Sequence, residues 1–175
     1  MVTVGVPFLT QIDPREKLKG SVDPLGLQPL WTRLGRRVIR NLTTVTTSLR
    51  EFTTLLLGFR FAEILVEERG EPAESFTHFF LKFEQIAAYS LYAWRDVVGA
   101  DANRIRGIQR VQKRLSEASR VRISAHPDHQ ILANQRTYGL WGLYSIASVN
   151  SGFLSPDRRR LSDEARTFVD REYLN

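Results

Sequence analysis

The sequence predicts a mainly α-helical fold, on three observations. Apolar residues recur every three or four positions through several long segments, which keeps one face of a helix apolar. Prolines and glycines gather near the N-terminus and between these segments. The hydrophobic content of 42% and charged content of 25% are ordinary for a globular chain. We expect an extended N-terminal arm over residues 1–28, a helical core over 29–118, and a C-terminal unit with a short β-hairpin over 119–175.

The arm is predicted because Pro7, Pro14 and Pro24 prevent a long helix. A first helix is expected over about 29–41, with Leu30, Trp31, Leu34 and Val38 on one face and arginines on the other. The β-branched run at 42–48 favours an irregular joint. A second helix over about 49–68 has one apolar side, made of Phe52, Leu55, Leu56, Phe59, Ala62 and Val66.

The central helix is predicted over 75–98, and it should form the middle of the core because its aromatic side chains need partner surfaces. Its apolar residues are Phe76, Phe79, Phe80, Phe83, Ile86, Ala87, Leu91, Trp94, Val97 and Val98. Gly99 should end it. A fourth helix over about 102–118 has a narrow apolar stripe and a basic ridge. The ridge is either a solvated face or a phosphate-binding surface, and it contains Arg106, Arg110, Lys113 and Arg114.

The most specific local pattern lies at 138–174. A weak helix over about 131–143 leads to Gly152, which can end a helix in the left-handed conformation. Phe153-Leu154 then suits a short strand, Ser155-Pro156-Asp157 a turn, and Ser162 the N-cap of a last helix. Three arginines, Arg158 to Arg160, project from the turn.

This pattern resembles the recognition helix, wing and closing helix of winged-helix proteins. The resemblance implies a groove-binding helix at 137–150 and wing arginines at 158–160. Two features depart from the family. Only Leu161 separates the arginines from Ser162, which leaves a very short second wing strand, and the helix lacks Arg, Lys and Gln for reading bases. The unit could therefore bind protein, or phosphate alone.

A looser similarity covers residues 23–63. Asp23-Pro-Leu-Gly, Trp31-Thr-Arg-Leu-Gly-Arg and Asn41-Leu-Thr-Thr are similar to segments of uncharacterised helical proteins encoded among prokaryotic defence genes. The resemblance implies a place in a defence or DNA-processing complex. It assigns no role to any residue.

The formal charge is +6 and the isoelectric point is about 10.1. Residues 1–50 carry eight basic and three acidic groups, 51–100 carry four and eight, and 101–175 carry thirteen and eight. Arginine outnumbers lysine by 21 to four, which suits phosphate binding but also follows from GC-rich codons. The predicted nucleic-acid contacts are Arg106, Arg110, Lys113, Arg114, Arg136, Arg158, Arg159 and Arg160.

Enzyme motifs give weaker indications. The chain has no P-loop, dinucleotide fingerprint or nucleophile elbow. His126-Pro-Asp-His129 is a poor metal site because His78 is the only further histidine and cysteine is absent. The spacing of Arg120 and His126, and of Arg122 and His129, is similar to that of HEPN-type ribonucleases, which implies acid–base chemistry by histidine. We expect no metal and no cofactor.

The leading hypothesis is a non-enzymatic subunit that binds nucleic acid, DNA in preference to RNA. The alternatives are a helical adaptor that binds other proteins or itself through the arm and the aromatic 138–144 stretch, and the ribonuclease. No apolar run approaches the roughly 20 residues of a membrane span, and the N-terminus has no basic region or long apolar stretch typical of a signal peptide. We therefore expect a cytoplasmic protein without a membrane partner.

Overall fold

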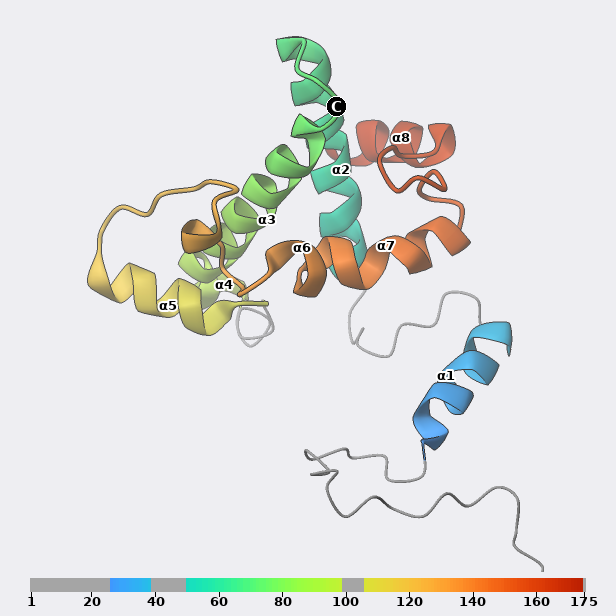
Figure 1. Ribbon diagram of the computed structural model, residues 1–175. Coiled ribbons are helices and arrows are strands. Elements are labelled where there is room, and N and C mark those ends of the chain that lie inside the picture. Colours follow the sequence, from blue (N-terminus) through green and yellow to red (C-terminus); the bar gives the residue numbers. More distant parts are fainter. Residues whose placement is uncertain (1–25, 39–49, 99–105, 175) are drawn as a thin grey trace, which may run out of the picture.

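The computed structural model describes residues 26–38, 50–98 and 106–174, and within them the chain is mainly helical (Figure 1). The prediction of a mainly α protein is confirmed. Residues 1–25 of the predicted 1–28 arm, the predicted joint at 42–48 and Gly99 lie outside the described residues, and helix already begins at Leu27 within the range predicted as arm. The elements in chain order are α1 Leu27–Val38, α2 Arg50–Arg69, α3 Ser75–Ala93, α4 Arg95–Val98, α5 Ile108–Glu117, the 3₁₀ helix η2 Pro127–His129, α6 Gln135–Tyr138, α7 Leu140–Asn150, α8 Asp163–Val169 and the π-helical η3 Asp170–Leu174.

The main core forms where α2, α3, α7 and α8 meet (Figure 1). Phe59 of α2 lies at its centre and is fully buried. Its ring centroid is 5.2 Å from those of Phe76 and Phe80 on α3 and 5.1 Å from that of Trp141 on α7. The α2–α3 crossing is close at Gly58, where a Cβ atom would lie 2.8 Å from the Phe83 ring. Aromatic edge contacts therefore join the three helices.

A smaller core joins α3 to α5 and to the segment before α6. Ala88 and Tyr89 of α3 are buried there against Val111 of α5 and Ile131. Leu115, Val121 and Leu132 pack around them. The narrow apolar stripe of α5 is therefore enough to hold this helix on α3. The helices α2 to α8 that form the two cores are here called the body.

The buried face of α3 differs from the prediction in its C-terminal half. Phe76, Phe79 and Phe80 are buried as expected, but Ile86 is 52% exposed and Trp94 is 62% exposed. Val97, in α4, is also exposed. The buried face beyond Phe80 contains Leu81, Glu84, Gln85, Ala88 and Tyr89 instead.

Hydrogen bonds to distant segments explain why these polar residues are buried. Gln85 Nε2 donates to the Ser124 carbonyl at 2.8 Å, and Gln135 Nε2 donates to the Leu81 carbonyl at 2.8 Å and to Glu84 Oε2 at 2.9 Å. Glu84 Oε1 also accepts from the Leu140 N–H at 2.7 Å. This buried network fixes the start of α7 against α3.

The C-terminal unit contains one antiparallel bridge, Leu154 to Leu161, and none of its described residues forms a strand. The expected β-hairpin is therefore not shown as paired strands, because Ser162 begins the α8 cap directly after the bridge. Two other local predictions, for Gly152 and Ser162, are confirmed. Gly152 has φ +76°, and the Ser162 hydroxyl accepts from the Ala165 N–H at 3.2 Å. The helix expected over about 131–143 begins only at Gln135.

The expected recognition helix at 137–150 is divided at Gly139 into α6 and α7. Trp141 and Tyr144 of α7 are buried in the main core, so this face of the helix packs on the body. Among the described helices, none has the length and apolar character needed to span a bilayer.

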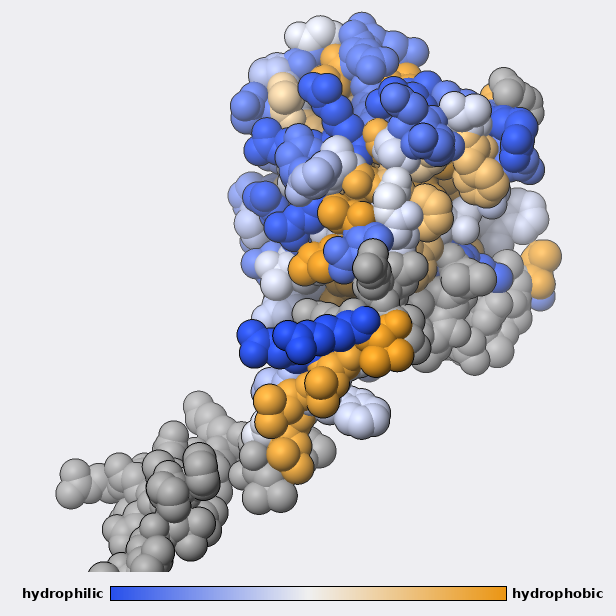
Figure 2. Space-filling model, turned by 90° about the vertical axis from the view of Figure 1, so that its right-hand side faces the viewer, coloured by the Kyte–Doolittle hydropathy of each residue, from blue (hydrophilic) through white to orange (hydrophobic). Residues whose placement is uncertain are grey.

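Helix α1 was expected in the core, but its apolar face is exposed. Figure 1 shows α1 apart from the other helices, and Figure 2 shows its apolar residues as a band on the surface beside hydrophilic side chains. Leu30 is 57% exposed, and Trp31 is 76% exposed. The described part of the chain thus leaves one strongly amphipathic helix without an apolar partner surface.

Candidate nucleic-acid interface

The segment 155–160, here called the arginine loop, leaves and re-enters the core at two buried leucines. Leu154 and Leu161 are each 3% exposed and form the antiparallel bridge. The Ser155 N–H donates to the Arg160 carbonyl at 2.9 Å, and the Ser162 N–H donates to the Phe153 carbonyl at 2.9 Å. Both ends of the loop are therefore held by backbone hydrogen bonds and apolar burial.

Hydrogen bonds inside the loop fix its turn. The Arg158 N–H donates to the Ser155 carbonyl at 2.8 Å, the Arg159 N–H donates to Asp157 Oδ1 at 3.1 Å, and the Ser155 hydroxyl donates to the same oxygen. These bonds, the Ser155 hydroxyl first, lower the pKa of Asp157, and the charges of Arg160 and Arg159 add to the effect. Asp157 is therefore an ionised turn residue of the type that Asp commonly supplies.

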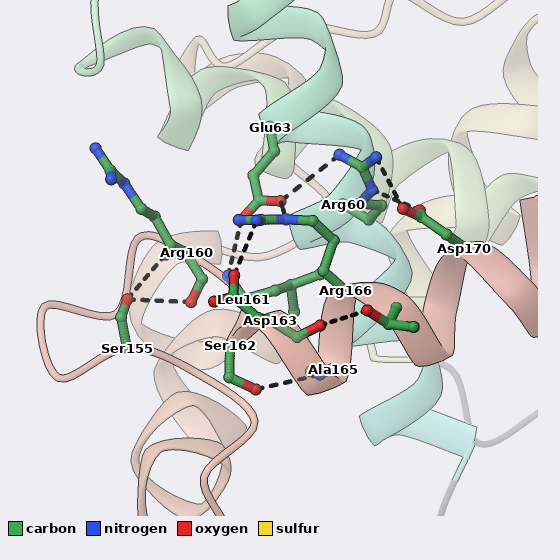
Figure 3. A network of polar contacts seen from close by, with 11 residues as sticks. Arg60, Glu63, Ser155, Arg160, Leu161, Ser162, Asp163, Ala165, Arg166 and Asp170 are labelled. Atoms are coloured by element: carbon green, nitrogen blue, oxygen red, sulfur yellow. Dashed lines mark hydrogen bonds and ion pairs between the residues drawn. The ribbon is translucent and has the colours of Figure 1, made fainter.

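Glu63 of α2 holds the far end of the loop (Figure 3). Its side chain is 6% exposed, and its Oε1 accepts from the Leu161 N–H at 2.7 Å. Its Oε2 lies 3.2 Å from Arg166 Nε and 3.8 Å from Arg60 Nη1. Arg60 in turn donates to Asp170 at 2.6 and 3.0 Å, and this carboxylate raises the pKa of Arg60. The network ties the loop and α8 to α2.

The three arginines themselves are exposed. Within the described ranges, no carboxylate forms an ion pair with Arg158, Arg159 or Arg160, whereas Arg60, Arg166 and Arg171 are all paired. Figure 3 shows the Arg160 side chain pointing away from the Glu63 network. Arg158 has φ +56°, a conformation that few non-glycine residues adopt, so its backbone is held by the turn. The loop therefore presents three charges from a fixed backbone.

The basic residues of α5 have a different setting. Arg114 donates to the carbonyls of Asp128, His129 and Gln130, and Arg110 donates to the Gln130 carbonyl at 3.0 Å. Lys113 lies 3.9 Å from Glu117. These guanidinium groups satisfy the carbonyls at the end of η2, where the helix-end dipole also favours a cation. Two members of the predicted ridge thus make contacts within the fold.

Arg106 is partly buried, whereas Arg136 is exposed. Arg106 Nε is buried without a hydrogen-bond partner, and its charge acts on Glu84. The Arg136 guanidinium lies 6.0 Å from the centroid of the Trp141 ring. Figure 1 places α5 and α8 at opposite sides of the body, so the predicted contacts do not gather on one surface.

The histidine segment forms the short helix η2. His126 is its N-cap, with Nδ1 accepting from the Asp128 N–H at 3.3 Å, and His129 Nδ1 lies 2.7 Å from Ser124 Oγ. No three His, Asp or Glu side chains among the described residues are grouped as metal ligands would be. The pairing of Arg120 with His126 that resembles HEPN-type ribonucleases stays a prediction.

Glu63 and Glu84 are buried, and sequence reasoning did not single them out as structural residues. Both carry a signal in the sequence. Glu63 follows Phe59 by four residues and precedes Val66 by three, and Glu84 follows Phe80 by four and precedes Ala87 by three, so each lies on the apolar side of its helix. The partners of Glu84 give no such signal, because Gln135 and Leu140 lie more than 50 residues away.

Comparison of the chain with protein-family models, with curated proteins and with solved structures finds no match in any of the three.

Proposed function

We propose that the chain is a non-enzymatic nucleic-acid-binding subunit that contacts phosphates through the arginine loop. The observation that carries this proposal is three consecutive exposed arginines, without carboxylate partners among the described residues, on a loop fixed at both ends. Arg158 to Arg160 then play the part that the winged-helix resemblance gives to wing arginines. The same proposal includes a winged-helix-like unit and a place in a DNA-processing or defence complex.

Physical chemistry favours phosphate as the ligand of such a loop. Guanidinium groups make paired, charge-assisted hydrogen bonds to phosphate oxygens. A loop already fixed by Glu63, Leu154 and Leu161 loses little conformational entropy on binding. Arg110 and Arg114 do not enter the proposal as free contacts, since their guanidinium groups bind backbone carbonyls. The affinity should be modest and sensitive to salt.

The double variant Arg159→Ala/Arg160→Ala tests the loop. Each phosphate contact adds about one unit to the slope of log binding constant against log salt concentration, so this variant should bind duplex DNA more weakly, with a slope shallower by about two units. Fluorescence anisotropy over a salt series measures both quantities. Arg158 stays unchanged because of its backbone conformation.

The matched control is Arg120→Ala/Arg122→Ala, which removes the same charge from two exposed arginines outside the loop. It should keep the wild-type slope. Equal losses in both variants would mean that binding follows overall charge and that the loop has no special part. Titration of a single-stranded RNA of the same length tests the preference for DNA.

A second candidate function is a helical adaptor, and the exposed apolar face of α1 favours it. Added salt strengthens association through apolar surfaces, whereas it weakens the binding of arginines to phosphates. Light scattering at low and high salt therefore separates the two functions. Oligomers that persist at high salt would support the adaptor, and retention on DNA only at low salt would support the arginine loop.

A further inference from the structure

Among the exposed apolar side chains of the described residues, two groups lie on separate elements. The first is the stripe of α1, which recurs at the three- and four-residue spacing of a single helix face. Its residues are Leu27, Leu30, Trp31, Leu34 and Val38, and each is more than half exposed. Neither described apolar core contains a residue of this stripe.

Helix α1 needs an apolar partner surface. It has 12 residues, and isolated helices of about this length are marginal in water. Its helical state therefore depends on docking the apolar stripe. Regular anchors on one helix face are typical of a helix that docks against an apolar surface.

The second surface lies along the outer side of α2, α3 and α4 and is here called the outer strip. It consists of Phe61, Phe83, Ile86, Trp94 and Val97. The rings of Phe61 and Phe83 stack with their centroids 5.4 Å apart, which joins α2 to α3 at one end of the outer strip. Ile86 is 52% exposed, Trp94 62% and Val97 74%, so the strip is open along α3 and α4.

The α1 stripe is short enough to fit on the outer strip. The stripe spans twelve residues from Leu27 to Val38, and the part of the strip on α3 and α4 spans fifteen from Phe83 to Val97. At a rise of about 1.5 Å per residue, the stripe is about 16 Å long and the strip about 21 Å.

The two surfaces match in charge. Arg33 and Arg37 are exposed beside the α1 stripe, and α1 contains no acidic residue. The outer strip is bracketed by exposed acidic residues. Glu68 follows Phe61 by two turns on the same side of α2, and Asp96 lies in α4. The nearby Arg95 guanidinium is turned onto the Tyr92 ring, 4.6 Å from its centroid.

We propose that α1 of one copy docks on the outer strip of a second copy, and that the exchange is reciprocal. A two-fold dimer of this kind covers both apolar surfaces of both chains, and domain swapping is a known route to such dimers. Because the exchange uses neither the arginine loop nor its partners, the inference does not depend on nucleic-acid binding.

The test is the molar mass of the full chain by light scattering after gel filtration. The wild type should be a dimer. The variants Leu30→Glu/Leu34→Glu, on α1, and Ile86→Glu/Trp94→Glu, on the outer strip, should each be monomers that still unfold in one cooperative thermal transition. The matched control Ile146→Glu/Phe168→Glu changes two exposed apolar residues outside both surfaces and should remain dimeric.

Mixing the two monomeric variants separates exchange between copies from docking within one copy. The mixture retains one intact helix and one intact strip on different chains, so it should form a heterodimer that neither variant forms alone. A monomeric wild type, or a dimer unaffected by the α1 variant, would overturn the proposal. Sedimentation of monomers with phosphatidylserine vesicles, abolished by Leu30→Glu/Leu34→Glu, would also overturn it and assign α1 to a membrane surface.

Discussion

At the scale of single residues, Glu84 has the most strongly shifted pKa among the described residues. Burial raises its pKa from 4.5 to about 7, and the opposing effects of the Leu140 N–H, Gln135 and the Arg106 charge do not offset the loss of water. In this position the Glu84 carboxyl accepts hydrogen bonds from Gln135 of α6 and from the Leu140 N–H of α7, which joins both helices to α3. The cost is that its ionisation weakens the fold.

The pH dependence of stability should follow from this shift. Between pH 4.5 and about 7 the folded chain holds a proton on Glu84 that the unfolded chain has released, so the free energy of unfolding falls as pH rises. The loss from this group should be roughly 3 kcal/mol and complete above about pH 7. Urea unfolding at pH 4 and pH 8 measures it. Glu84→Gln cannot ionise and should lack this component; the same pH-dependent loss in the variant would contradict the assignment.

At the scale of secondary-structure elements, Arg114 joins α5 to η2 by polar contacts. Its guanidinium spans three consecutive carbonyls at the end of η2, which a planar group with several donors can do and a single ammonium cannot. Helix α5 is thereby fixed to the turn that leads into the smaller core. The predicted basic ridge thus works here as a connection within the fold.

Arg114→Lys should therefore destabilise the protein although it preserves the charge. Loss of several charge-assisted hydrogen bonds should lower the free energy of unfolding by about 2 kcal/mol and speed amide exchange at His129 and Gln130. Urea unfolding and hydrogen exchange measure the two effects. Lys113→Ala, at an exposed ion pair one residue away, should change stability by less than about 0.5 kcal/mol. Wild-type exchange rates in Arg114→Lys would show that the connection is dispensable.

At the scale of the whole molecule, both apolar cores lie between α2 and the C-terminus. Residues 50–175 should therefore unfold in one cooperative thermal transition without α1, at a Tm that does not change with protein concentration. Calorimetry at two concentrations measures this. A fragment without a cooperative transition would mean that α1 is part of the folding unit.

The sequence predicted the helices better than their surroundings. Spacing alone located α2 within a residue at each end, and Ser162 marked the start of α8, because caps and periodicity are local properties. The prediction that Ile86 and Trp94 are buried was wrong, because this part of α3 buries Gln85 instead. Gln85 is buried through its hydrogen bond to the carbonyl of Ser124, which lies 39 residues away in the sequence. The settings of Arg110 and Arg114 were missed for the same reason, as their acceptors lie 14 to 20 residues further along the chain.

The bridge between Leu154 and Leu161 has a consequence for how this molecule can vary. Six residues lie between the two leucines, and the bridge and the burial of both leucines fix the two ends of the loop. Residues 156–160 can therefore be exchanged for another five-residue turn at little expense to folding. A change in one turn then alters the charge and shape of this surface while the helices stay the same.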